Sequence, residues 1–215
     1  MKVVLAALAL TCSLLFSLPT RAEETLNKLH LIISWDMSGS MRTNGPVDWT
    51  RAGADFFNEY FSNYHHRCQV VTVDMISWGL QSLPPVHIEL KSRDESDLLA
   101  DYASKLTRFK HDGTSPRVGM LYANSYVAPG YNKTVILFVS DSGINGEGNS
   151  ELWHLVEPTT EFYGISLSDS LSRNYVANHI VPQHGRHFHA ETESHFRDIL
   201  TMILDDLGQD NCPTS

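Results

Sequence analysis

Cysteine is scarce in this 215-residue chain, and the few cysteines are isolated from one another. The sequence holds three, Cys12, Cys68 and Cys212, and no Cys-x-x-Cys pair. Closely spaced cysteine pairs are typical of thiolate zinc sites and of thioredoxin-type redox motifs. The sequence therefore supports neither kind of site.

Cationic side chains are also few. The chain has 16 Lys and Arg residues against 25 Asp and Glu residues, a formal net charge of −9. Phosphate backbones and anionic membrane surfaces repel a chain of this charge, so we expect no nucleic-acid partner. The same excess of carboxylates favours cation binding in general, without indicating where a cation would bind.

Three common catalytic signatures are missing from the sequence. There is no Gly-x-Ser-x-Gly elbow, no His-Glu-x-x-His motif and no glycine-rich phosphate loop. The chain also lacks internal repeats, low-complexity segments and anything that resembles a domain linker. These absences favour a single domain that is not an enzyme.

One apolar run stands at the start of the chain. Residues 3–18 follow the positive Lys2, are interrupted by hydroxyl residues, and lead into small residues that end at Ala22. This pattern is typical of a cleaved secretory signal peptide, and a membrane anchor is the alternative. We expect a signal peptide over residues 1–22 and a secreted or periplasmic domain over residues 23–215, with no membrane span in the mature chain.

The rest of the chain alternates between strand and helix patterns. Runs of apolar and β-branched residues predict strands at 29–35, 69–78, 86–90, 134–140, 161–167 and 186–189. Apolar stripes and capping signals predict helices that begin near residues 47, 92, 116, 150 and 170, and a last helix across 196–207.

This alternation predicts an α/β fold, a single doubly wound and mostly parallel sheet flanked by helices. In the third strand Val86, Ile88 and Leu90 alternate with His87 and Glu89. Such a period of two is typical of a half-exposed strand, so we expect one antiparallel strand at an edge of the sheet.

Polar side chains follow two of the predicted strands. Asp36, Ser38 and Ser40 come directly after the first strand, and Asp141 follows the strand at 134–140. In a doubly wound sheet of order 3-2-1-4-5-6 the first and fourth strands are neighbours, and ligands bind in the crevice at their carboxyl ends. Thr114 precedes a helix on the same rim. Carboxylate and hydroxyl oxygens suit Mg²⁺, Mn²⁺ or Ca²⁺ better than zinc or copper.

These residues together resemble the metal-ion-dependent adhesion site of von Willebrand factor type A (vWA) domains. The element order is similar to that fold across the whole mature chain, and other segments resemble a bacterial branch of small secreted vWA-like proteins of unknown function. The resemblance implies direct metal contacts from Ser38 and Ser40, with Asp36 and Asp141 often acting through water. It implies that Thr114 joins directly in some states.

The function implied by the resemblance is non-enzymatic. A metal held by few charged ligands keeps a coordination position open to an acidic side chain of a partner protein. Two alternatives stay open at this stage. The metal could activate water in a hydrolase, or it could only order the loops of a structural or sensor domain. Taken alone, Thr114 could also be an ordinary helix cap.

Histidines near the end of the chain form an alternative candidate metal site. His184, His187, His189 and His195 lie close together in the sequence, and imidazole clusters can hold zinc or copper. No acidic or cysteine ligand accompanies them at a typical spacing, so we prefer a solvent-facing strand edge as their explanation.

The two cysteines of the mature chain can pair. Cys68 precedes the second strand, and Cys212 follows a last helix that runs antiparallel to the strands. The predicted topology places both at the amino end of the sheet. In an oxidising compartment they can form one disulfide far from the candidate site. The sequence does not indicate the oligomeric state.

Overall fold

The computed structural model describes residues 27–43, 46–63, 69–79, 84–90, 98, 101–102, 105, 113, 115–141, 151–168 and 170–209. Its strands are β1 (Asn27–Asp36), β2 (Gln69–Trp78), β3 (Val86–Leu90), β4 (Lys133–Ser140), β5 (Glu161–Leu167) and β6 (Arg186–Ala190). Its helices are α1 (Gly39–Thr43), α2 (Pro46–Asn63), α4 (Pro116–Ser125), α5 (Ser170–Tyr175) and α6 (Glu193–Gln209), with short helical turns η1 (Trp153–Leu155) and η2 (Val176–Ile180).

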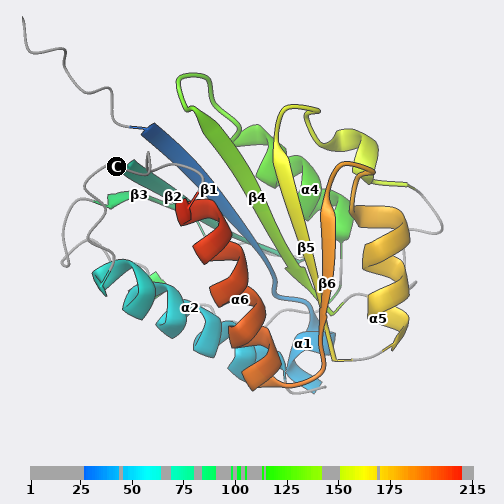
Figure 1. Cartoon of the computed structure of the whole chain (residues 1–215). Coiled ribbons are helices and arrows are strands. Elements are labelled where there is room, and N and C mark those ends of the chain that lie inside the picture. Colours follow the sequence, from blue (N-terminus) through cyan, green and yellow to red (C-terminus); the bar gives the residue numbers. More distant parts are fainter. Residues whose placement is uncertain are drawn as a thin grey trace, which may run out of the picture.

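The strands form one six-stranded sheet in the order β3-β2-β1-β4-β5-β6 (Figure 1). All neighbours are parallel except β2 and β3, which are antiparallel. The α/β sheet, its strand order and its antiparallel edge strand are thus confirmed. The alternation in β3 explains its place, because Ile88 is buried while His87 and Glu89 on the other face are exposed.

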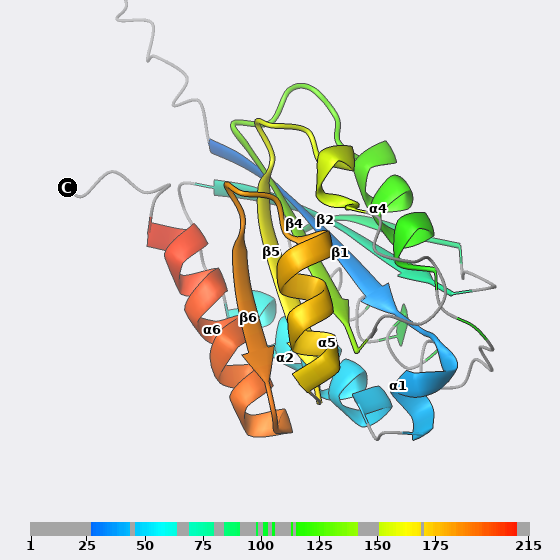
Figure 2. The ribbon, with the colours of Figure 1, turned by 90° about the vertical axis from the view of Figure 1, so that its right-hand side faces the viewer.

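Helices cover both faces of the sheet, with α2 and α6 on one face and α4 and α5 on the other (Figures 1 and 2). In β1, Leu31 and Ile33 belong to the core beneath α2 and α6, whereas Ile32 between them belongs to the core beneath α4. Because a central strand buries both faces, β1 is a continuous apolar run rather than an alternating one.

Two predicted helices differ from the observed ones. The helix expected near residue 150 is only the turn η1, because Glu157 precedes Pro158, and a residue before proline disfavours the helical conformation. The helix expected from Ser170 is α5, which continues as the π-helical turn η2 as far as Ile180. The helix predicted from residue 92 falls mostly outside the described residues.

Several sequence predictions concern parts of the chain that the structure does not describe. Three predictions lie outside the described residues: the signal peptide at residues 1–22, the metal ligand Thr114, and the disulfide between Cys68 and Cys212. Within those residues, no helix combines the length and apolar character needed to cross a membrane.

Candidate functional site

The carboxyl ends of β1 and β4 bring the polar residues of the candidate site together. The two strands are adjacent and parallel, with Trp35 opposite Val139, so the residues that follow them reach the same edge of the sheet. The Ser40 hydroxyl donates a hydrogen bond of 2.8 Å to Asp141 Oδ1. Since the Ser40 proton is used there, the Ser38 hydroxyl donates to Ser40 Oγ at 2.9 Å.

Asp36 is the buried anchor of this network. Its side chain is fully buried, and its Oδ1 accepts the backbone N–H of Ser38 at 2.8 Å. Its Oδ2 accepts the hydroxyl of Ser140 at 2.6 Å. Four of the predicted residues, Asp36, Ser38, Ser40 and Asp141, therefore lie within one hydrogen-bonded cluster.

Ser140 is a member of this cluster that sequence reasoning missed. It is the last residue of β4, fully buried, and lies on the strand face that also carries Phe138. The signal for it is a hydroxyl at the end of an otherwise apolar strand. Its partner Asp36 can be identified only once β1 and β4 are paired in register.

Packing fixes the loop that carries Ser38 and Ser40. The backbone N–H of Met37 donates to the carbonyl oxygen of Trp78 at 2.9 Å, which ties the loop to the end of β2. Met37 and Met41 insert into the core at 3% and 1% exposure. At Gly39 the chain enters the short helix α1, which the sequence analysis did not predict.

Aromatic contacts hold the end of β1 just before Asp36. The Trp35 ring packs edge-on against Phe57 of α2 and Phe196 of α6, with centroid distances of 6.3 and 6.1 Å. Such edge-to-face pairs contribute about 0.5–1.5 kcal/mol each beyond area burial. The bulky Trp35 therefore links both helices of one face to the base of the site.

The donor set of the cluster fits a hard divalent cation. Asp36 and Asp141 are two carboxylates at 0% and 5% exposure, and they are linked by the backbone N–H and hydroxyl of Ser38 and by the hydroxyl of Ser40. Burying two carboxylates is costly unless positive charge or hydrogen bonds offset it. A cation that prefers oxygen ligands, such as Mg²⁺, would supply that charge.

The histidines near the chain end do not form a comparable site. His187 Nε2 and His189 Nδ1 each lie 2.9 Å from Ser166 Oγ, and His184 Nε2 lies 3.2 Å from the Thr160 carbonyl oxygen. Burial, then the neighbouring His189 and Arg173, lower the pKa of His187 to about 4. His187 and His189 lie half-buried on the edge strand β6, and His184 and His195 are exposed. Among the described residues no three His, Cys, Asp or Glu side chains are grouped to hold a metal.

A polar triad with two buried members spans β1, β2 and β3. Asp74 Oδ2 lies 2.5 Å from His30 Nε2, and Asp74 Oδ1 lies 2.7 Å from His87 Nδ1. His30 and Asp74 are 1% and 2% exposed, whereas His87 is 63% exposed. The ring of Tyr131 stacks on His30 at a centroid distance of 4.4 Å. The triad links β1, β2 and β3, and sequence reasoning did not identify it.

Comparisons with known proteins give no match by sequence, either to a family model or to a curated protein. Solved structures do match. They include a von Willebrand factor type A protein from Catenulispora acidiphila, with a TM-score of 0.57 and 12% identity over 83% of this chain and 42% of that one. The pilus adhesin SpaC from Lactobacillus rhamnosus GG has a TM-score of 0.60 and 14% identity over 87% of this chain and 31% of that one.

A third similar structure is the PilB minor pilin from Streptococcus sanguinis, with a TM-score of 0.57 and 11% identity over 87% of this chain and 63% of that one. The chain thus spans less than two thirds of the length of each of these three proteins. At such low identity the likeness shows the fold alone, and that fold is the vWA fold that the sequence motifs resemble.

Proposed function

We propose that this chain, which has the fold of von Willebrand factor type A domains, is a non-enzymatic adhesion-type module that binds a protein partner through a divalent cation. The observation that carries the proposal is the hydrogen-bonded cluster of Asp36, Ser38, Ser40 and Asp141 at the carboxyl edge of the sheet. Residues from two distant segments converge there, as a ligand site at the switch point of a doubly wound sheet requires.

Five residues are assigned to the cation. Ser38 and Ser40 would hold Mg²⁺ directly, Asp36 and Asp141 would balance its charge, and Thr114 would complete the set. Mn²⁺ or Ca²⁺ could take the same oxygen ligands. When bound, the cation supplies an electrophilic position for an acidic side chain of the partner.

The rest of the site orients these ligands. The Ser140 hydroxyl holds one Asp36 oxygen and the Ser38 amide holds the other, so the carboxylate is already fixed before any partner arrives. The Met37 contact with Trp78 holds the intervening loop in place. A site organised in this way loses little conformational entropy on binding, which favours affinity.

The similar structures and the chain start support an extracellular role. SpaC is described as a pilus adhesin and PilB as a minor pilin. Together with the predicted signal peptide at residues 1–22, they favour a protein that is secreted or periplasmic and meets its partner outside the cytoplasm.

The test is a calorimetric titration of Mg²⁺ and Mn²⁺ into the purified protein and into Asp36→Asn. We expect saturable one-site binding that the substitution abolishes. Asp198→Asn, a substitution on the exposed surface of α6, is the matched control and should bind as the wild type does. Equal binding by wild type and Asp36→Asn would contradict the assignment of the site.

A second measurement separates adhesion from a purely structural metal. Partners are captured from the extracellular fraction with immobilised protein, with and without EDTA, while circular dichroism follows the fold. An adhesion module loses its partner in EDTA and stays folded. Loss of the fold in EDTA would instead indicate a metal that only orders the loops.

A further inference from the structure

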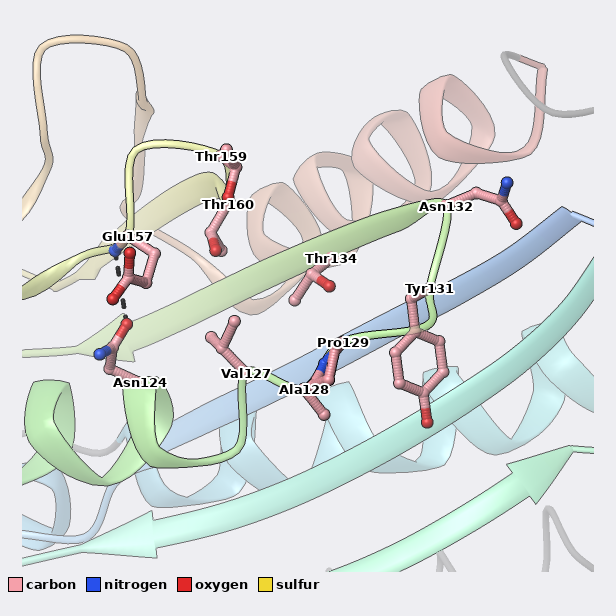
Figure 3. A pocket seen from close by; sticks show the side chains of 10 residues that line it. All are labelled: Asn124, Val127, Ala128, Pro129, Tyr131, Asn132, Thr134, Glu157, Thr159 and Thr160. Atoms are coloured by element: carbon pink, nitrogen blue, oxygen red, sulfur yellow. Dashed lines mark hydrogen bonds between the residues drawn. The ribbon is translucent and has the colours of Figure 1, made fainter.

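Figure 3 shows a polar cleft, which lies at the amino end of β4, whereas Asp36 lies at the carboxyl end of the parallel strand β1. Its volume is about 460 Å³, within the range of small-molecule sites. Thr134 stands at the start of β4 and Thr160 just before β5, so the cleft opens at the amino end of these strands. It is lined by Asn124, Val127, Ala128, Pro129, Tyr131, Asn132, Thr134, Glu157, Thr159 and Thr160.

One buried hydroxyl in this cleft has no hydrogen-bond partner in the described part of the chain. Thr160 is 1% exposed, and its Oγ1 makes no hydrogen bond to any described residue. Figure 3 shows its side chain pointing into the space bounded by Thr134, Val127 and Asn124. An unsatisfied buried polar group is destabilising, so native structures rarely keep one without a ligand, water or other role.

An amide and a carboxylate face each other at the mouth of the cleft. The backbone N–H of Glu157 donates to Asn124 Oδ1 at 3.4 Å, which leaves the Asn124 side-chain NH₂ as a donor beside the Glu157 carboxylate (Figure 3). A carboxylate accepts hydrogen bonds and an amide NH₂ donates them. Neighbouring hydroxyl groups on a ligand, each able to donate and accept, match such a pair.

The remaining lining limits the ligand class further. Among the ten described residues that line the cleft, Glu157 is the only charged one, so a phosphate or carboxylate ligand would meet repulsion there and no cation from this lining. A purely apolar ligand is disfavoured, because the hydroxyls of Thr134 and Thr159 would lose their hydrogen bonds to water and the Thr160 hydroxyl would stay without a partner. Val127 and Pro129 add a small apolar wall.

We propose that this cleft binds a neutral polyhydroxyl ligand, such as one monosaccharide unit of a glycan, with its hydroxyls on Asn124, Glu157 and Thr160. The site is independent of the cation site, since Thr134 and Ser140 stand at opposite ends of the same strand. Sugar binding here therefore needs no divalent cation.

The test uses the purified full-length protein in EDTA with a panel of probes: the methyl glycosides of glucose, galactose and mannose, and N-acetylglucosamine. Saturation-transfer NMR detects binding, and amide chemical shifts give the dissociation constant. We expect at least one probe to bind saturably, with a dissociation constant on the order of 1 mM. Ethanolamine tests the alternative that the Glu157 carboxylate selects an amine.

Two variants and one control locate the binding. Thr160→Val keeps the side-chain shape and removes the hydroxyl, so affinity should fall about tenfold, the effect of one lost hydrogen bond. Glu157→Gln should also weaken binding. Thr201→Val on α6, whose hydroxyl bonds within its own helix to Arg197, should leave binding unchanged.

A stability measurement separates the ligand role from a structural one. Because Thr160→Val removes an unpaired buried hydroxyl, the melting temperature of the unliganded variant should equal or exceed that of the wild type. A lower melting temperature would show that the hydroxyl has a structural partner. A lower melting temperature would therefore overturn the proposal. So would any of three binding results: no saturable binding of any glycoside, binding of ethanolamine alone, or unchanged affinity in Thr160→Val.

Discussion

Gly119→Ala is the substitution whose effect the packing defines most sharply. Gly119 lies in α4 against the indole ring of Trp78, and a Cβ placed there would meet three ring atoms at 2.6, 2.6 and 2.7 Å. Trp78 is fully buried and stacks on Phe138 at a centroid distance of 5.1 Å, so the ring cannot withdraw. The helix itself must therefore move.

The expected change in the free energy of unfolding is the difference between two opposing effects. Carbon atoms in contact prefer about 3.5–4.0 Å, so the helix must shift by roughly 1 Å. Overpacking of this severity costs about 3 kcal/mol, the upper part of the usual range. Alanine gains about 1 kcal/mol over glycine inside a helix. The free energy of unfolding should thus fall by about 2 kcal/mol, and the melting temperature by about 4–8 °C.

Thermal and urea unfolding of the wild type and four variants (Gly119→Ala, Val118→Ala, Trp78→Leu and the double variant Trp78→Leu with Gly119→Ala) test this reasoning. Val118→Ala, at an exposed position of the same helix, is the control and should change stability by less than about 0.5 kcal/mol. In a Trp78→Leu background the added methyl group has room, so Gly119→Ala should become neutral or stabilising. If Gly119→Ala lowers the free energy of unfolding equally in both backgrounds, the clash with Trp78 is not the cause, because substitutions at contacting residues should be coupled.

Three further predictions concern charged and titratable groups. Asp74→Ala should lower the free energy of unfolding by about 3 kcal/mol because it leaves His30 buried without its partner, whereas His87→Ala at the exposed end should cost less than about 1 kcal/mol in urea unfolding. The pKa of His187 is lowered to about 4 in the folded protein, so as the pH falls the unfolded chain binds a proton at this histidine first. The free energy of unfolding should therefore fall as the pH drops from about 6.5 to 4. In His187→Gln the plot of melting temperature against pH should be flatter over this range, and an unchanged slope would contradict the assignment. Mg²⁺ at about 100 times its dissociation constant should stabilise the wild type by about 2.7 kcal/mol in thermal melts and leave Asp36→Asn unchanged.

Much of the fold follows from local patterns in the sequence. The unbroken apolar run of β1 indicates a strand buried on both faces, and the alternation in β3 indicates an edge. The strand order then follows because a doubly wound sheet has few alternatives once the parallel strands alternate with helices and β3 is assigned to an edge. The meeting of Asp36 and Asp141 is a direct consequence of that order.

The parts that could not be predicted depend on contacts between distant strands. Ser140 becomes a partner of Asp36 only through the register of β1 and β4, and Asp74 meets His30 only through the register of β1 and β2. The helix α1 follows from the way Met41 inserts into the core, which no local pattern specifies. Thr114 and the disulfide between Cys68 and Cys212 stay predictions.

The central position of β1 has a consequence for how the chain acquires its structure. β1 is the first strand in the sequence, yet one of its edges pairs with β4, where Leu29 lies opposite Lys133. Pairings between such distant segments form slowly, and an apolar strand that is still unpaired during folding favours aggregation. A fragment of this chain that ends before β4 therefore leaves its innermost strand half paired, and it is expected to associate with other copies instead of folding.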